Sequence, residues 1–594
     1  MIAAAKWCVA PDKLAVWTQR VGSTARVQHR LCAKTARTER DTLCTQIPLV
    51  HRRKRSRACP HSLGAQPLWQ QPANNRRQAM KAVLPRPRGR WDQAVPPALR
   101  PLVRAYLLGY ASTVAPQLLA VLLAAYAALR RRRRAAAEGL PPEAEKTASL
   151  AAVAASVRRI FGDGLAWHGF PTFCAALVGG GTLLEVPFDK LLSRWPTGLS
   201  RLARARLARC LASFVSGYCS IQLLQGRETT DERERKTSDD GSKAREPATE
   251  PTKTAGRTLD LTLFAATGAA DVLVGSLWAR WRGRRSASQS RRRWTRTEAL
   301  VGAAIDPALF ALSSALVMWT WIYEPWRLPR SYDRWITAAA AVDGRLIEAL
   351  RRCRRGSLRY GEQADRPDND QSCLLQEMCR DYGWPPVWGD PAFTMPFPCD
   401  MVHMGCGPSC ERHAVVRLWR SWRWALATYL PLSLTLLLRP VRGAGGAAAR
   451  PRALLRRLVR ALLAAARSSA FLAAFVSLFF YGVCLARVRI GPRLLGRSAA
   501  ACQAIDGGLC TAAGCALCGW SILLERPGRR RDIALFVAPR ALATLLPRRY
   551  HHRYLWRESL LFAASSAVVL TTVREHPRRV RGLLGSVLKT VVAP

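Results

Sequence analysis

The sequence has few acidic residues and none of the common catalytic motifs. Only 40 Asp and Glu stand against 92 Lys and Arg in 594 residues, which gives a formal net charge of +52. This composition excludes an acidic disordered protein, a collagen and a small disulfide scaffold. The chain contains no G-x-S-x-G turn, Walker-type glycine loop, H-E-x-x-H helix or strand-linked G-x-G-x-x-G. We therefore expect a protein that is not an enzyme, with no catalytic and no organic cofactor-binding residues.

The excess of basic residues is compatible with phosphate binding, but their arrangement favours a membrane protein. Most are arginines in Ala-rich runs that flank apolar segments, as Arg130 to Arg134 follow the apolar stretch 103–129. Basic residues at the ends of apolar helices are typical of membrane flanks. We therefore expect the lipid bilayer as a partner and no nucleic acid.

Ten apolar stretches approach the length of about 20 residues that a membrane-spanning helix needs. The clearest, 468–486, carries no charge and is bounded by arginines, and 164–184 contains three consecutive glycines that would let a neighbouring helix approach closely. The sequence predicts an all-α, polytopic integral membrane protein with about ten transmembrane helices. The candidates are 103–129, 164–184, 207–225, 259–279, 307–323, 421–438, 468–486, 499–524, 533–546 and 558–573.

Similar stretches recur in the same order in the two halves of the chain. Residues 309–327 match 561–579 without a gap, and 260–264 match 532–536. This order predicts two duplicated halves. Five spans in each half would invert the second copy, as in many transporters, whereas an even number would leave the copies parallel. The arginine clusters lie on both sides of almost every span and do not decide between these topologies.

Composition divides the chain into segments. Residues 1–99 are Arg-rich and lack an apolar run long enough for a signal peptide, so we expect a disordered tail, with a mitochondrial targeting segment as the alternative. The predicted segments are the tail 1–99, a first membrane half 100–327 with a flexible polar loop at 226–258, a Cys-rich connecting loop 328–414, a second membrane half 415–580 and a C-terminal tail 581–594.

The connecting loop contains the one pattern that suggests a metal site. Cys399, His403, Cys410 and His413 follow one another closely, and four such ligands can hold a tetrahedral zinc ion. The spacing is not that of a standard zinc finger. Reduced structural cysteines are one alternative, and a disulfide in an oxidising compartment is another.

Four ionisable residues within or next to candidate spans are candidates for function, because charge is costly in a membrane and often functional there. Asp271 is one, and Asp306 precedes Pro307, where a helix start would favour its carboxylate. Asp506 is followed by two glycines, which suggests a helix break that could line a polar path. Placement at the membrane interface, or pairing of these acids with the fourth residue, Arg540, is the alternative.

A distinctive pattern of Pro, Cys and His runs through the end of the connecting loop and into the next span. Its residues are Pro398, Cys399, His403, Pro408, Ser409, Cys410, Tyr429, Leu430 and Pro431. With this pattern, the connecting loop and the spans after it resemble the transmembrane protein 135 family of Cys-rich peroxisomal membrane proteins. The resemblance covers 328–580 well and 100–327 in the manner of a fungal-type member, and 530–542 is similar to a later segment of the family.

The resemblance implies a multi-pass membrane protein of peroxisomes or mitochondria. Members are implicated in organelle dynamics and lipid homeostasis, so the implied partners are proteins of those processes, and the family has no established catalytic residues. One alternative is a small-molecule or lipid transporter or channel built from inverted repeats. A zinc-binding sensor loop on a membrane anchor is another.

Overall fold

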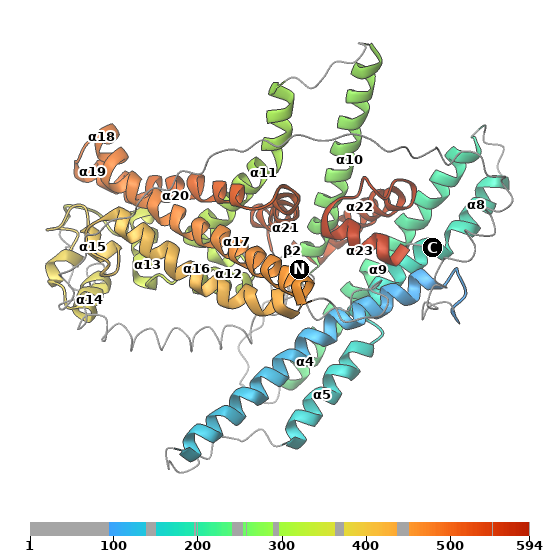
Figure 1. The fold of residues 1–594 in the computed structure, drawn as a ribbon, viewed down its shortest axis with the longest axis horizontal. Helices are drawn as coiled ribbons and strands as arrows, with labels where there is room; N and C mark the ends of the chain where they lie inside the picture. The colour runs from blue at the N-terminus through green and yellow to red at the C-terminus, as the bar shows by residue number, and fades with distance from the viewer. Residues whose placement is uncertain are drawn as a thin grey trace, which may run out of the picture. The chain divides into compact units, whose positions relative to one another are not determined.

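The computed structural model describes residues 94–137, 150–194, 198, 200–239, 254–256, 258–288, 296–362, 373–435, 451–548 and 550–592. These residues are almost entirely helical (Figure 1), which confirms the all-α prediction. The described strands, β1 (Thr254–Ala255) and β2 (Tyr550–His551), form one short antiparallel pair. Residues 1–93 of the predicted tail and 240–253 of the predicted polar loop lie outside the described residues.

The first half contains several long apolar helices. Pro171 lies in the first turn of its helix, where the missing N–H costs nothing. The elements are α4 (Arg100–Ala137), α5 (Leu150–Leu165), α6 (Phe170–Ala175), η2 (Ala176–Gly180), α7 (Gly181–Leu183), α8 (Glu185–Arg194), α9 (Arg201–Asp239), α10 (Leu259–Ser288) and α11 (Arg296–Tyr323).

The connecting segment 328–414 is folded into short helices around its own apolar core. Leu358, Leu375 and Met401 are fully buried there, and Gly356, with φ 74°, ends the amphipathic helix α13. The elements are η3 (Pro325–Arg327), α12 (Arg330–Ala340), α13 (Gly344–Arg355), α14 (Cys373–Tyr382), η4 (Pro386–Gly389) and α15 (Cys399–Val402).

The second half begins before the predicted boundary, because α16 starts at Cys410 inside the connecting segment. Two π-helical turns, η6 and η7, interrupt its long apolar helices. The elements are α16 (Cys410–Thr435), α17 (Pro451–Cys484), η6 (Leu485–Ile490), α18 (Gly491–Leu495), α19 (Ala499–Ala504), η7 (Ile505–Leu509), α20 (Cys510–Cys518), η8 (Gly519–Leu524), α21 (Pro527–Leu545), η9 (His552–Tyr554), α22 (Leu555–Glu575) and α23 (Gly582–Val592).

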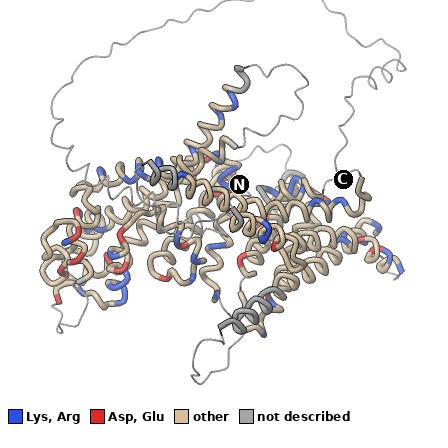
Figure 2. Tube along the Cα trace, turned by 90° about the horizontal axis from the view of Figure 1, so that it is seen from below, with Lys and Arg blue, Asp and Glu red and all other residues tan. Residues whose placement is uncertain are grey.

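Seven helical segments of the described chain are long and apolar enough to cross a bilayer, which is compatible with an integral membrane protein. Large apolar side chains such as Leu122, Leu277 and Leu312 are exposed on them, as lipid contact requires. Figure 2 shows Lys and Arg spread over most helices, with fewer Asp and Glu among them. The seven are Arg100–Arg130, Ala152–Arg194, Arg201–Gly226, Leu259–Trp281, Arg296–Tyr323, Leu455–Leu495 and Ala499–Leu524. The predicted stretches 421–438, 533–546 and 558–573 are not among them, so the count of about ten stays a prediction.

The helices of the two halves pack against each other. Helix α22 packs along α9 and α10, and α11 packs along α21 and α20. Within the second half, α16 lies beside α17 (Figure 1), and α17 also packs on α20. One core cluster therefore joins Trp321 of α11 to Phe479 of α17.

Two segments differ from their predicted structure. Helix α9 continues to Asp239, so the first part of the predicted loop 226–258 is helical. The reason lies in its composition, because Glu, Arg and Lys are good helix formers even without apolar periodicity. The predicted tail 581–594 contains α23, whose Leu588 and Val591 are buried against Val569 and Val573 of α22.

Candidate metal centre

Three of the four predicted metal ligands come together in the connecting segment. Cys399 begins α15, His403 directly follows that helix, and Cys410 begins α16. The donor atoms of the three side chains all lie within 4.8 Å of one another. His403 and Cys410 are buried, and Cys399 is partly buried. This group could hold a metal ion.

Local backbone geometry assembles the group from residues close in sequence. The His403 backbone N–H donates to the Cys399 carbonyl oxygen at 2.7 Å, so one helical turn places the two side chains on the same face. The chain then reverses through Met404, Gly405 and Gly407, all with positive φ. This turn returns the chain to Cys410, and glycine is the residue that adopts such angles without strain.

The hydrogen bond of His403 fixes which ring nitrogen can bind a metal. Its Nδ1 lies 2.8 Å from the Gly407 carbonyl oxygen. Because a carbonyl oxygen only accepts, Nδ1 carries the proton and Nε2 keeps a free lone pair. Metal-binding histidines are commonly oriented by such a bond on the other nitrogen. Burial lowers the pKa of His403, so the ring is held neutral, as a ligand must be.

His413, the fourth predicted ligand, stacks on His403 and lies outside the group of three. The ring centroids are 4.4 Å apart and the planes differ by 13°. Lone pairs lie in the plane of an imidazole ring, so the lone pairs of two parallel rings do not converge on one ion. Burial lowers the pKa of His413 to about 3, and its Nδ1 has no hydrogen-bond partner among the described residues.

The donor set is suited to a soft or borderline metal. Two thiols and an imidazole favour zinc and related ions, and none of the three donors is a carboxylate, which calcium and magnesium prefer. Burial raises the pKa of Cys399 when no metal is bound. A bound cation reverses this effect, because a coordinating thiol is deprotonated outright.

A second polar cluster lies between the two π-helical turns. Arg487 of η6 and Asp506 of η7 form a bidentate ion pair at 2.6 and 2.8 Å, with both side chains almost fully buried. The Tyr360 hydroxyl donates to the same carboxylate at 2.6 Å. The structure thus gives Asp506 a partner other than Arg540, the partner considered from the sequence. The irregular turn at Asp506 agrees with the helix break expected there.

The other predicted intramembrane residues lie apart from this cluster. Asp306 lies within α11, past its start at Arg296, and pairs with Arg531 of α21 at 3.1 Å. The helix-start interpretation is therefore wrong, because Arg531 supplies the positive partner. The Arg540 guanidinium lies 3.9 Å from the Phe536 ring centroid and donates to the Phe536 carbonyl oxygen. Asp271 is partly buried on α10.

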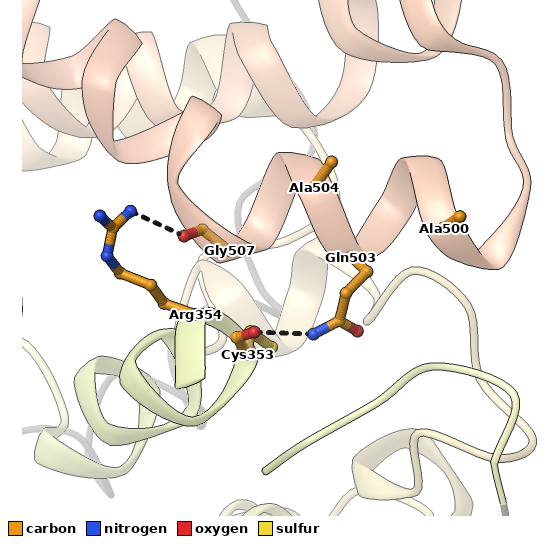
Figure 3. A pocket seen from close by; sticks show the side chains of 6 residues that line it. All are labelled: Cys353, Arg354, Ala500, Gln503, Ala504 and Gly507. Carbon is orange, nitrogen blue, oxygen red and sulfur yellow. Dashed lines mark hydrogen bonds between the residues drawn. The ribbon is translucent and has the colours of Figure 1, made fainter. Parts of the chain in front are cut away.

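An open pocket lies where α13 meets α19 and η7 (Figure 3). Gln503 donates to the Cys353 carbonyl oxygen at 2.8 Å, and Arg354 donates to the Gly507 carbonyl oxygen at 3.4 Å, so α13 is attached to α19 and η7. Its lining residues are Cys353, Arg354, Ala500, Gln503, Ala504 and Gly507.

The sequence interpretation missed two residues of the polar cluster. The sequence interpretation treated Arg487 only as the residue that ends the apolar run 468–486. In the structure the helical segment continues beyond it to Leu495. A sequence signal was present, since further apolar residues follow Arg487. Tyr360 carries no such signal, because its contact with Asp506 spans 146 residues.

Comparison of the chain with protein-family models, curated proteins and solved structures finds no significant match.

Proposed function

We propose that the chain is a multi-pass membrane protein whose connecting segment binds a structural zinc ion. The observation that carries this proposal is the buried convergence of Cys399, His403 and Cys410. Zinc fits because it takes thiolate and imidazole ligands in tetrahedral sites. The burial of His403 and Cys410 favours a closed, structural site over a catalytic one, which would keep a position open to water.

Metal analysis of the purified protein tests this proposal. The full chain in detergent is expected to carry one zinc ion, which Cys399→Ser and His403→Ala each remove. Cys219→Ser is the matched control, because Cys219 is an exposed cysteine of α9. A wild-type protein that stays metal-free after incubation with zinc would contradict the proposal.

We further propose that the protein acts in the peroxisomal or mitochondrial membrane, in organelle dynamics and lipid homeostasis. This role rests on the resemblance of the Cys-rich pattern to the transmembrane protein 135 family, and the seven bilayer-length helices are compatible with it. Fractionation and imaging of the tagged protein test the location. Recovery in neither organelle would contradict it, and unchanged organelle shape and lipid content after deletion would contradict the role.

We also propose that the chain consists of two duplicated halves, as the sequence predicts. Two aromatic contacts support this duplication. Phe310 and Phe562 occupy equivalent positions in the two matched stretches. The Phe310 ring lies 5.6 Å from that of Phe471, and the Phe562 ring lies 5.8 Å from that of Phe173. Each copy of the repeated helix therefore meets a phenylalanine of a different apolar helix, α17 or α6.

Two glycine contacts support the same duplication. Ala311 and Ala563 are also equivalent in the matched stretches. A Cβ on Gly519 would lie 2.4 Å from the Ala311 Cα, and one on Gly217 would lie 3.2 Å from the Ala563 Cα.

Mapping the side of the membrane on which 328–414 and the two termini lie tests the topology. With five spans per half, the termini share one side and the connecting segment faces the other, whereas a shared side for all three would require parallel copies.

A transporter or channel is the second candidate function, and the buried Arg487–Asp506 pair favours it. Paired charges at interrupted helices are typical of substrate and ion pathways in membranes. In proteoliposomes, a flux of ions or lipids that Asp506→Asn abolishes would support transport. The control is Glu411→Gln, which removes an exposed pair with Arg489. Equal flux in the Asp506→Asn variant would exclude this pair from the pathway.

A further inference from the structure

We infer that Cys484 is the fourth ligand of the metal site, so that the ion joins the connecting segment to the long apolar helix α17. This inference rests on the proposed zinc binding and adds a ligand from a different part of the chain. Cys484 is the last residue of α17 and lies 81 residues from His403 in sequence.

The position of the Cys484 thiol carries the inference. Its Sγ is buried and lies 3.3 Å from the Nε2 of His403, the ring nitrogen that carries no proton, and the thiol is within hydrogen-bonding distance of it. The Cys484 thiol is also within hydrogen-bonding reach of Cys410, and Cys410 is within the same reach of Cys399. The four side chains therefore form one continuous cluster.

The distance fits a shared metal. With a Zn–S bond of about 2.3 Å and a Zn–N bond of about 2.0 Å, two tetrahedral ligands place sulfur and nitrogen about 3.5 Å apart. The observed 3.3 Å is close to this value. A tetrahedral site built from Cys399, His403 and Cys410 lacks one ligand, and Cys484 supplies it from the side of the group that faces α17.

The other nearby donors fit less well. His413 stacks parallel to His403, so its lone pairs do not converge on the same ion. Cys406 lies in the turn between His403 and Cys410, where its backbone N–H donates to the His403 carbonyl oxygen at 3.3 Å. A Cys3His set of Cys399, His403, Cys410 and Cys484 is therefore the set that the geometry supports.

The charge of this site is compatible with its surroundings. On binding Zn²⁺, three thiols release three protons to solvent and three thiolates bind the ion, with no change in oxidation state. The neutral imidazole adds no charge, so the site carries one negative charge. Arg487, three residues after Cys484, lies close enough to interact electrostatically with Cys399 and Cys484. Its guanidinium also pairs with Asp506, and its positive charge favours the thiolate form of these two cysteines.

The number of thiolates on the metal tests the inference in the intact protein. Full-length protein in detergent is loaded with Co²⁺, whose near-ultraviolet thiolate absorption grows with the number of sulfur ligands. X-ray absorption of the zinc-loaded protein counts sulfur neighbours independently of any variant. We expect three sulfurs and one nitrogen in the wild type, and two sulfurs would overturn the inference.

Variants then identify the third sulfur. Cys484→Ser is expected to lower the Co²⁺ thiolate absorption by about one third and to weaken zinc binding at least tenfold. Cys484→His keeps a ligand and is expected to retain the ion with the lower absorption. Cys515→Ser is the control, because Cys515 is equally buried but lies on α20. Unchanged absorption in both Cys484 variants would overturn the inference and leave the zinc proposal intact, whereas a metal-free wild type would overturn both.

Discussion

Arg417 is a buried cation that attaches α16 to the end of α12. Its side chain is 4% exposed. It donates to the Ala340 carbonyl oxygen and, at 3.2 Å, to that of Ala341, whose φ of 46° ends α12. Its guanidinium also lies 4.4 Å from the Phe480 ring centroid. Burial lowers the pKa of Arg417 to about 10, so it stays charged at neutral pH.

Replacing Arg417 with alanine is expected to reduce the free energy of unfolding by about 2–4 kcal/mol, because it leaves two helix-end carbonyls without a charged donor. The thermal unfolding midpoint in detergent measures this effect. Arg420→Ala, at an exposed position on the same helix, is the control and is expected to change it little. Equal midpoints for the two variants would show that the Arg417 contacts contribute nothing.

At the scale of elements, the ion pair between the π-helical turns η6 and η7 predicts a large cost for removing one charge. Asp506→Asn leaves the buried Arg487 without a counter-charge, and such a change costs about 3–5 kcal/mol. Glu411→Gln breaks an exposed pair with Arg489, and exposed pairs contribute about 0–1 kcal/mol. Unfolding midpoints of both variants compare the two costs. If the two variants lower the unfolding midpoint equally, burial does not increase the contribution of the Arg487–Asp506 pair to stability.

Close packing of η8 against α11 gives a second prediction for an element. A Cβ at Gly519 would lie 2.4 Å from the Ala311 Cα, so the two backbones would have to separate. Gly519→Ala is therefore expected to cost about 1–3 kcal/mol, the usual range for overpacking. Gly528 on α21 has open space around it, so Gly528→Ala should cost little. A stable Gly519→Ala variant in the same unfolding assay would contradict this packing.

The sequence predicted those features that depend on neighbouring residues. Long apolar runs identified most of the helices. The three metal-ligand candidates that converge were predicted because Cys399, His403 and Cys410 lie close together in sequence. The Arg487–Asp506 pair was missed, because partners in different helices leave no local pattern. His413 was included from its spacing alone, which does not reveal that its ring stacks on His403.

At the scale of the whole molecule, the proposed zinc ion would contribute to overall stability. Metal binding to a site absent from the unfolded chain adds directly to folding free energy. A chelator is therefore expected to lower the unfolding midpoint of the wild type by several degrees. The Cys399→Ser variant should not respond to the chelator, and an equal decrease in both proteins would indicate an effect unrelated to this site.

The exchange of helix partners between the halves has a consequence for biosynthesis. Gln225 of α9 accepts a hydrogen bond from Ser559 of α22, which is made 334 residues later. At about 5–20 residues per second, the ribosome needs roughly 20–70 s to cover that distance. During this interval α9 and α10 are already in the nascent chain without their final neighbour. The early helices thus require lipid or an assembly factor to cover surfaces that α22 later occupies.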